Sequence, residues 1–127
     1  MKKILIAEDE EILREVLVDR IKQGGFLTLE AVDGEEGLKM ALSEHPDLIL
    51  LDILMPKVDG ITVLKKLRED AWGKSVPVIM LSNVSPDDNQ LEEIVKNEAS
   101  YYLSKVGVSM EDIVNKIQEL LEPKPIS

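Results

Sequence analysis

One short apolar run constrains the fold of this chain more than any other feature. Residues Leu48–Leu51 are all aliphatic, and the run delivers a carboxylate, Asp52, before the chain breaks at Pro56 and Gly60. A run this short between turn-forming residues is typical of a strand buried on both faces. Sheets of such strands bind ligands at the strands' carboxyl ends, where Asp52 would lie. The plain alternative is that Asp52 only ends the strand and solvates a loop.

Short apolar runs alternate with amphipathic stretches along the whole chain. The predicted strands are Lys3–Ala7, Phe26–Ala31, a central strand ending at Asp52, Val76–Leu81 and Tyr101–Ser104. Five helices are predicted between and after these strands. The first carries Ile12 to Ile21, the second runs from Glu35 to Glu44, and the third runs from Ile61 to about Ala71. The fourth starts at Ser85 and ends near Asn97, and the fifth follows Ser109. Five strand–helix units predict an α/β fold with a parallel sheet and right-handed crossovers. We expect the doubly wound, flavodoxin-like (βα)5 arrangement with strand order 2-1-3-4-5.

Capping residues mark three of the predicted helix starts. They are Asp33, followed by Glu36; Ser85, followed by Pro86; and Ser109, followed by Asp112. Each places a short oxygen acceptor where the first backbone N–H groups of a helix need a partner.

Composition narrows the function. The 127 residues fit one domain, and we expect it to span residues 1–122, with 123–127 as a tail or the start of a linker. Fifteen Lys and Arg against 25 Asp and Glu give a net charge of −10, which disfavours binding of nucleic acid or anionic membrane. The absence of cysteine excludes disulfides and thiolate chemistry. No signal peptide or membrane-spanning run is visible, so we expect a cytoplasmic protein.

Polar residues follow four of the predicted strands. They are Glu8 and Asp9 after the first, Asp52 at the end of the third, Ser82 after the fourth and Lys105 after the fifth. In the expected strand order these ends meet at the topological switch point. Converging carboxylates repel one another unless a cation joins them, and oxygen ligands of this kind suit Mg²⁺.

Such a cluster could carry out phosphoryl transfer. The Asp52 carboxylate is a possible nucleophile toward phosphorus, with Mg²⁺, the Lys105 ammonium and the Ser82 hydroxyl each neutralising one phosphoryl oxygen. Each residue also has a plain interpretation: Lys105 as a surface lysine, Ser82 as the start of a turn, and the acids at 8 and 9 as helix caps. His45 is expected in a polar loop and Trp72 as the cap of the third helix, neither in the site.

The chain resembles the receiver domain of two-component response regulators over nearly its whole length. The matching segments are Ile4–Glu10, Asp33–Leu38, Leu51–Gly60, Val78–Ser82 and Tyr102–Lys105. The run Asp-x-x-Met-Pro-x-x-Asp-Gly from Asp52 to Gly60 is the most specific of them.

The resemblance implies a role for each site residue. Asp52 would accept a phosphoryl group from a histidine kinase or phosphotransfer protein, and Glu8, Asp9 and the Leu54 carbonyl would help to hold Mg²⁺. Ser82 and Tyr102 would form a switch pair that changes the surface of the fourth helix, fifth strand and fifth helix. That surface would contact a second copy or a downstream target. Such a protein is not an enzyme for other substrates, because it catalyses only its own phosphorylation and dephosphorylation.

Four positions depart from the family pattern. Glu8 stands where an aspartate is usual, which favours a contact with the metal through water. Val106 follows Lys105 where proline is usual, so we expect a trans bond between them. Asn83 stands where a smaller residue is usual, beside the phosphoryl site. Tyr101 next to Tyr102 leaves open which ring is the switch, since neighbours in a strand face opposite ways.

Two other functions stay open. An Asp-nucleophile phosphatase would use the same chemistry, but such enzymes carry a second Asp two residues after the nucleophile, where this chain has Leu54. A pseudo-receiver that only makes protein contacts would not need the full set of Asp9, Asp52, Ser82 and Lys105.

Overall fold

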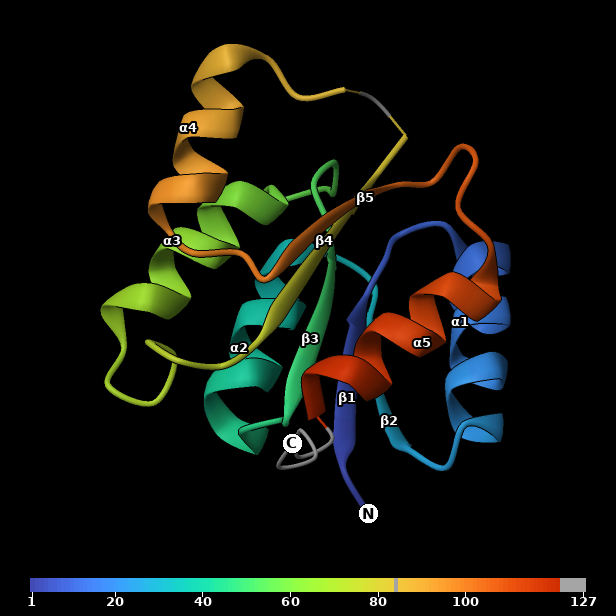
Figure 1. The fold of residues 1–127 in the computed structure, drawn as a ribbon. Coiled ribbons are helices and arrows are strands. Elements are labelled where there is room, and N and C mark those ends of the chain that lie inside the picture. Colours follow the sequence, from blue (N-terminus) through green and yellow to red (C-terminus); the bar gives the residue numbers. More distant parts are fainter. Residues whose placement is uncertain (84, 122–127) are drawn as a thin grey trace, which may run out of the picture.

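A five-stranded parallel sheet lies between two layers of helices (Figure 1). The computed structural model describes residues 1–83 and 85–121. The strands are β1 (Lys3–Ala7), β2 (Leu27–Ala31), β3 (Leu48–Asp52), β4 (Val78–Ser82) and β5 (Tyr101–Ser104). The helices are α1 (Glu11–Gln23), α2 (Gly34–Glu44), α3 (Gly60–Glu69), α4 (Asp88–Lys96) and α5 (Met110–Leu121). The strand order β2-β1-β3-β4-β5 confirms the predicted doubly wound fold.

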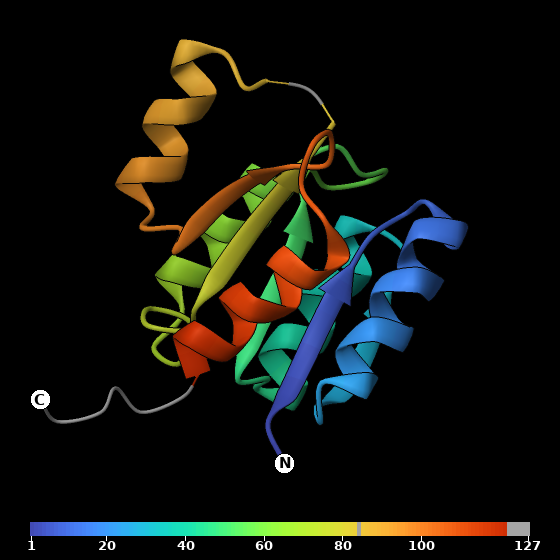
Figure 2. The same cartoon turned by 45° about the vertical axis from the view of Figure 1, so that its right-hand side comes forward.

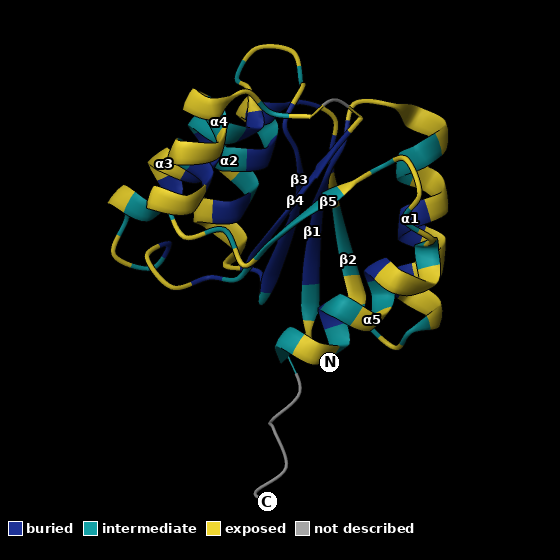
Figure 3. Ribbon diagram, turned by 45° about the horizontal axis from the view of Figure 1, so that its top comes forward, coloured by how far each residue is buried: buried dark blue, intermediate teal, exposed yellow. Residues whose placement is uncertain are grey.

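Helices cover both faces of the sheet, as the continuous apolar strands predicted. Helices α2, α3 and α4 pack on one face, and α1 and α5 on the other (Figure 2). Every residue of β3 and β4 is buried, while the outer faces of the helices are exposed (Figure 3). Alternate strand residues feed the two layers: Leu5 and Ile49 lie on the α2–α4 side, and Ile4 and Leu48 on the α1–α5 side.

Two of the predicted caps are confirmed and one is wrong. Asp33 accepts a hydrogen bond from the Glu36 N–H at 2.8 Å, and the Ser109 hydroxyl oxygen accepts one from the Asp112 N–H at 3.0 Å. Helix α4, in contrast, begins after Asp87 rather than after Ser85.

The cause is a reciprocal capping box in the same segment. The Asp87 carboxylate accepts from the Gln90 N–H, and the Gln90 side chain accepts from the Asp87 N–H. Two orphan donors are satisfied at once, whereas a single serine would satisfy one.

Three other boundaries differ by one or two residues. Strand β2 begins at Leu27, one residue after the predicted start. Strand β4 begins at Val78 because Pro77 has no N–H to give to the ladder. Helix α3 ends before Asp70, whose carboxylate accepts from the N–H groups of Trp72 and Gly73 and turns the chain.

The end of β3 is held in place by a glycine. Gly60 starts α3 and donates its N–H to the Ile53 carbonyl at 2.8 Å. A Cβ at this position would collide with the backbone carbonyl of Asp52. Only glycine therefore allows the β3–α3 loop to close against the strand that carries Asp52.

Two predictions from the sequence meet limits here. The expected domain boundary after residue 122 and the tail 123–127 lie outside the described residues. Among the described helices, none combines the length and the apolar character needed to cross a bilayer.

Candidate functional site

The predicted site residues meet at the carboxyl edge of the sheet, toward which the strand arrows point in Figure 2. Asp52 ends β3 and pairs in register with Leu81, so that Ser82 follows on the neighbouring strand. Glu8 and Asp9 follow β1, and Lys105 follows β5. The topology thus brings all five together, although 97 positions separate the first from the last.

Lys105 is the central contact of the site. Its Nζ lies 3.0 Å from Asp52 Oδ2 and 2.7 Å from Glu8 Oε1. The side chains of all three residues are buried: Lys105 is 7% exposed, Glu8 2% and Asp52 4%. The Lys105 N–H donates to the Ser82 carbonyl at 2.7 Å, which fixes where the side chain starts. One buried cation is therefore shared between two buried carboxylates.

Burial perturbs all three ionisable groups. It raises the pKa of Glu8 to about 7, because the Lys105 ammonium offsets only part of the lost hydration. Burial also raises the pKa of Asp52, again against the opposing effect of Lys105. For Lys105 burial alone would lower the pKa, but its contacts with Glu8 and Asp52 outweigh it and raise that pKa. Burial therefore disfavours the ionised carboxylates of Glu8 and Asp52, while their contacts with Lys105 favour its charged form.

The acids form a plausible metal site. Glu8, Asp9 and Asp52 each offer one carboxylate oxygen, and these oxygens lie within 4.8 Å of one another. Glu8 Oε1 is buried and, among the described residues, no donor meets it with hydrogen-bond geometry, although the Lys105 ammonium lies 2.7 Å away. A buried anionic oxygen without a hydrogen bond of good geometry and an all-oxygen donor set both fit a hard divalent cation such as Mg²⁺.

Backbone groups tie Asp52 and Glu8 to the neighbouring loops. The Leu54 N–H donates to Asp52 Oδ1 at 3.3 Å, and the Glu10 N–H donates to Glu8 Oε2 at 3.1 Å. The Arg14 guanidinium donates to the Glu8 carbonyl at 3.0 Å. The peptide bond between Lys105 and Val106 is trans, which confirms the prediction.

The two adjacent tyrosines face different layers. Tyr101 packs on the α1–α5 side, where its hydroxyl donates to Glu119 Oε1 at 3.2 Å and Lys116 Nζ lies 4.6 Å from its ring centroid. Tyr102 packs on the α2–α4 side. Of the two rings, Tyr102 is therefore the one on the side of α4 and of the loop that follows Ser82.

Neither His45 nor Trp72 takes part in the site. His45 ends α2 with a left-handed backbone (φ 46°), and its ring stacks on Trp72 with 4.5 Å between centroids. Both lie near the amino ends of the strands. The expectation that Trp72 caps the third helix is wrong, because Asp70 does so.

One polar residue of the site, Glu10, was missed, and it contacts Asn83, which was expected beside the phosphoryl site. Glu10 Oε1 lies 3.7 Å from Lys105 Nζ and accepts a hydrogen bond from Asn83 Nδ2 at 3.3 Å. The available signal was the position of Glu10, directly before α1, where a glutamate is a poor cap.

Known proteins are similar to this chain over most of its length. The family model of the response regulator receiver domain matches residues 4–118. The DNA-binding dual master transcriptional regulator RpaA of Synechocystis is 32% identical over 95% of this chain and 49% of its own length. The polar-differentiation response regulator DivK of Brucella ovis is 32% identical over 94% of this chain and 96% of its own.

Solved structures agree. A CheY-like receiver domain protein from Methanospirillum hungatei superposes with a TM-score of 0.88 at 25% identity, covering 95% of this chain and 94% of that one. The Francisella response regulator 1452 receiver domain gives 0.83 at 30% identity, covering 94% and 96%. The chain spans about half the length of RpaA and nearly all of DivK. With the fold, the acidic cluster and these matches together, the chain belongs to the response regulator receiver domains of two-component signalling.

Proposed function

We propose that Asp52 accepts a phosphoryl group from a histidine kinase or phosphotransfer protein in a Mg²⁺-dependent reaction. The observation that carries the proposal is the Lys105 ammonium, held 3.0 Å from the Asp52 carboxylate beside a cluster of three acids. A cation at this point would neutralise the negative charge on the phosphoryl oxygens during transfer to Asp52. The donor would itself be phosphorylated by ATP. It would meet this chain in the cytoplasm, where we expect the chain to be located.

In the reaction an Asp52 oxygen attacks phosphorus. The bond from phosphorus to the donor breaks as the bond to Asp52 forms, and the donor leaves with the electron pair. Lys105 exchanges a carboxylate oxygen for a phosphoryl oxygen, and the Ser82 hydroxyl donates to another. Asp9, Asp52 and the Leu54 carbonyl would hold Mg²⁺, which supplies further neutralisation of the phosphoryl charge when bound.

Glu8 takes a supporting role in this proposal. Its carboxylate is already engaged by Lys105 and by the Glu10 N–H. Burial raises the pKa of Glu8, and a metal ion would favour its ionised form, either by direct contact or through water.

Phosphorylation would then change the surface of α4, β5 and α5. Ser82 is drawn toward the phosphoryl group, and Tyr102 moves inward behind it on the α4 side of the sheet. A local change in charge thereby biases a two-state packing. A second copy of the chain or a downstream target would read the altered surface. The chain acts as a switch that catalyses only its own phosphorylation and dephosphorylation.

The test is labelling by a small phosphodonor with Mg²⁺, followed by intact mass measurement. Wild type and Asp19→Asn should each gain one phosphoryl group, because Asp19 lies on the exposed face of α1. Asp52→Asn should gain none, and chelation of Mg²⁺ should abolish labelling. An unlabelled wild type would favour a pseudo-receiver, and steady hydrolysis of a generic phosphate ester would favour a phosphatase.

A further inference from the structure

Glu10 occupies a helix-capping position without capping the helix. It precedes α1, and its side chain makes no hydrogen bond to the first turn. Ser, Thr, Asp and Asn are the residues that satisfy those N–H groups well. The Glu10 side chain instead reaches away from its own helix, which points to a use elsewhere.

Its contacts join two loops across the site. Glu10 Oε1 accepts from Asn83 Nδ2 at 3.3 Å, and the same oxygen lies 3.7 Å from Lys105 Nζ. The first loop follows β1 and the second follows β4. Because a carboxylate only accepts hydrogen bonds, the Asn83 amide must present its nitrogen here.

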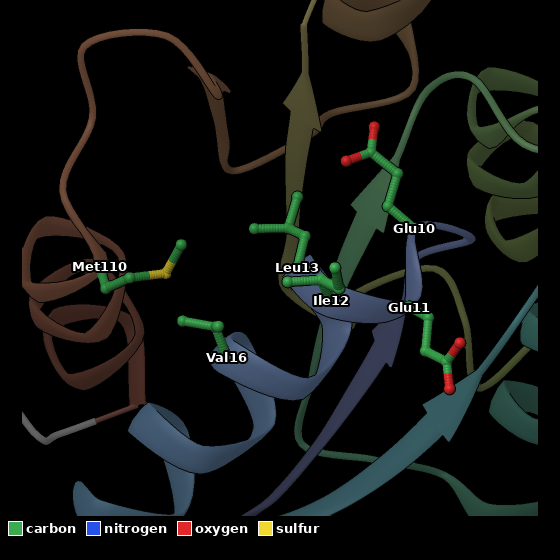
Figure 4. A pocket seen from close by; sticks show the side chains of 6 residues that line it. All are labelled: Glu10, Glu11, Ile12, Leu13, Val16 and Met110. Atoms are coloured by element: carbon green, nitrogen blue, oxygen red, sulfur yellow. The ribbon is translucent and has the colours of Figure 1, made fainter.

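Glu10 forms the outer rim above a buried ammonium. Its side chain is 53% exposed, whereas that of Lys105 is 7% exposed. Figure 4 shows the Glu10 and Glu11 carboxylates pointing in different directions from the start of α1. Of these two glutamates, Glu10 is the one whose carboxylate lies near the ammonium that also pairs with Asp52.

We propose that Glu10, held by Asn83, is an electrostatic gate that determines which phosphodonors reach Asp52. The inference rests on the proposed phosphorylation of Asp52. A donor phosphoryl group must approach Lys105, and Glu10 both repels its negative charge and competes for the same ammonium. Glu10 forms and breaks no covalent bond. It lowers the rate for strongly anionic small donors more than for donors of lower charge.

The test compares two donors on two matched variants. Glu10→Gln and Glu11→Gln remove the same charge one residue apart, but only the first removes it from Lys105. Labelling rates are measured at saturating Mg²⁺ with acetyl phosphate, a dianion near neutral pH, and with phosphoramidate, which carries less net charge. Glu10→Gln should accelerate acetyl phosphate labelling roughly fivefold, with a smaller gain for phosphoramidate and none for Glu11→Gln.

Ionic strength separates a charge effect from a change of shape. In about 1 M salt the screening length falls to ~3 Å, and most of the gain for Glu10→Gln should vanish. Asn83→Leu keeps the bulk of the side chain but removes the amide that holds Glu10. It should give a smaller acceleration with the same salt dependence.

The outcomes distinguish the two proposals. If neither donor labels wild type or any variant, phosphorylation of Asp52 is wrong and the gate is wrong with it. If wild type is labelled but Glu10→Gln behaves as Glu11→Gln does, the gate alone is wrong. A gain that is equal for both donors and insensitive to salt also overturns the gate.

Discussion

Cationic side chains lie at both edges of the sheet, in opposite electrostatic settings. Near the amino ends of β4 and β5, the Arg68 guanidinium donates to four backbone carbonyls at 2.7 to 3.0 Å. They belong to Gly73, Val76, Asn97 and Glu98. At the carboxyl edge, Lys105 has three carboxylates within 3.7 Å.

The two settings suit different roles: the contacts of Arg68 serve the stability of the fold, and those of Lys105 serve the chemistry of the site. Arg68 meets neutral backbone acceptors that need a donor, so its contacts close two loops, and burial of the guanidinium lowers its pKa. Lys105 has three carboxylates around one ammonium, and burial raises the pKa values of Glu8 and Asp52 although the ammonium opposes this. We therefore expect changes at the amino edge to affect folding and changes at the carboxyl edge to affect phosphorylation.

The largest effect should come from Lys105→Met. Loss of the ammonium removes charge stabilisation of the phosphoryl group and should slow Asp52 labelling by roughly 10²–10³-fold. Arg68→Met should label at the wild-type rate below its unfolding temperature. The measurement is the labelling rate by intact mass at saturating Mg²⁺. An equal loss of labelling rate in Lys105→Met and Arg68→Met would contradict the assignment of phosphorylation to the carboxyl edge and folding to the amino edge.

Arg68→Met should instead lower the free energy of unfolding by about 3 kcal/mol, because carbonyls at the starts of two strands lose a charged donor. Lys66→Met, an exposed position on the same helix, is the matched control and should change little. Denaturant unfolding of the three proteins measures the effect. A loss below that of Lys66→Met would show that water replaces the guanidinium freely.

The pH dependence of stability should expose the cost of burying Glu8. Its folded pKa, about 7, lies above the ordinary value of 4.5, so the folded state binds this proton more tightly than the unfolded state. Stability should fall as pH rises from about 4.5 to 7 and level off above. Relative to Glu8→Gln, metal-free wild type should lose on the order of 3 kcal/mol over that range.

Unfolding in the presence of a chelator, at a series of pH values, measures this difference. Carboxylates outside the cluster of Glu8, Asp52 and Lys105 are common to both proteins, so their titration cancels. A difference that is flat with pH would mean that Glu8 is ionised in the folded protein throughout, fully paired with Lys105.

The smallest effect should be stabilisation by Mg²⁺. At ten times the dissociation constant, one bound ion adds about 1.4 kcal/mol to the free energy of unfolding. Asp9→Asn should weaken this response, while Asp70→Asn, at the amino edge, should keep it. Thermal unfolding across a Mg²⁺ titration measures both. A response that survives in Asp9→Asn would remove Asp9 from the metal site.

The sequence predicted the fold and most of the site for one physical reason. Parallel strands gather their carboxyl ends at one edge, so residues that follow those strands, such as Asp9, Asp52 and Lys105, must converge once the strand order is known. No knowledge of loop conformation is needed for that step.

Other contacts depend on loop conformation and were not predictable in the same way. Glu10 meets Asn83 only through the conformations of two loops, and no spacing rule relates them. Arg68 is invisible to a motif search because its acceptors are backbone carbonyls. The start of α4 was misplaced because two capping signals, at Ser85 and Asp87, compete within three residues.

The close approach of Gly60 to the Asp52 carbonyl means that main-chain packing helps to fix the backbone from which the Asp52 carboxylate projects. Any side chain at position 60 would displace the β3–α3 loop from the end of β3. A protein altered there could remain folded and still lose its reactivity.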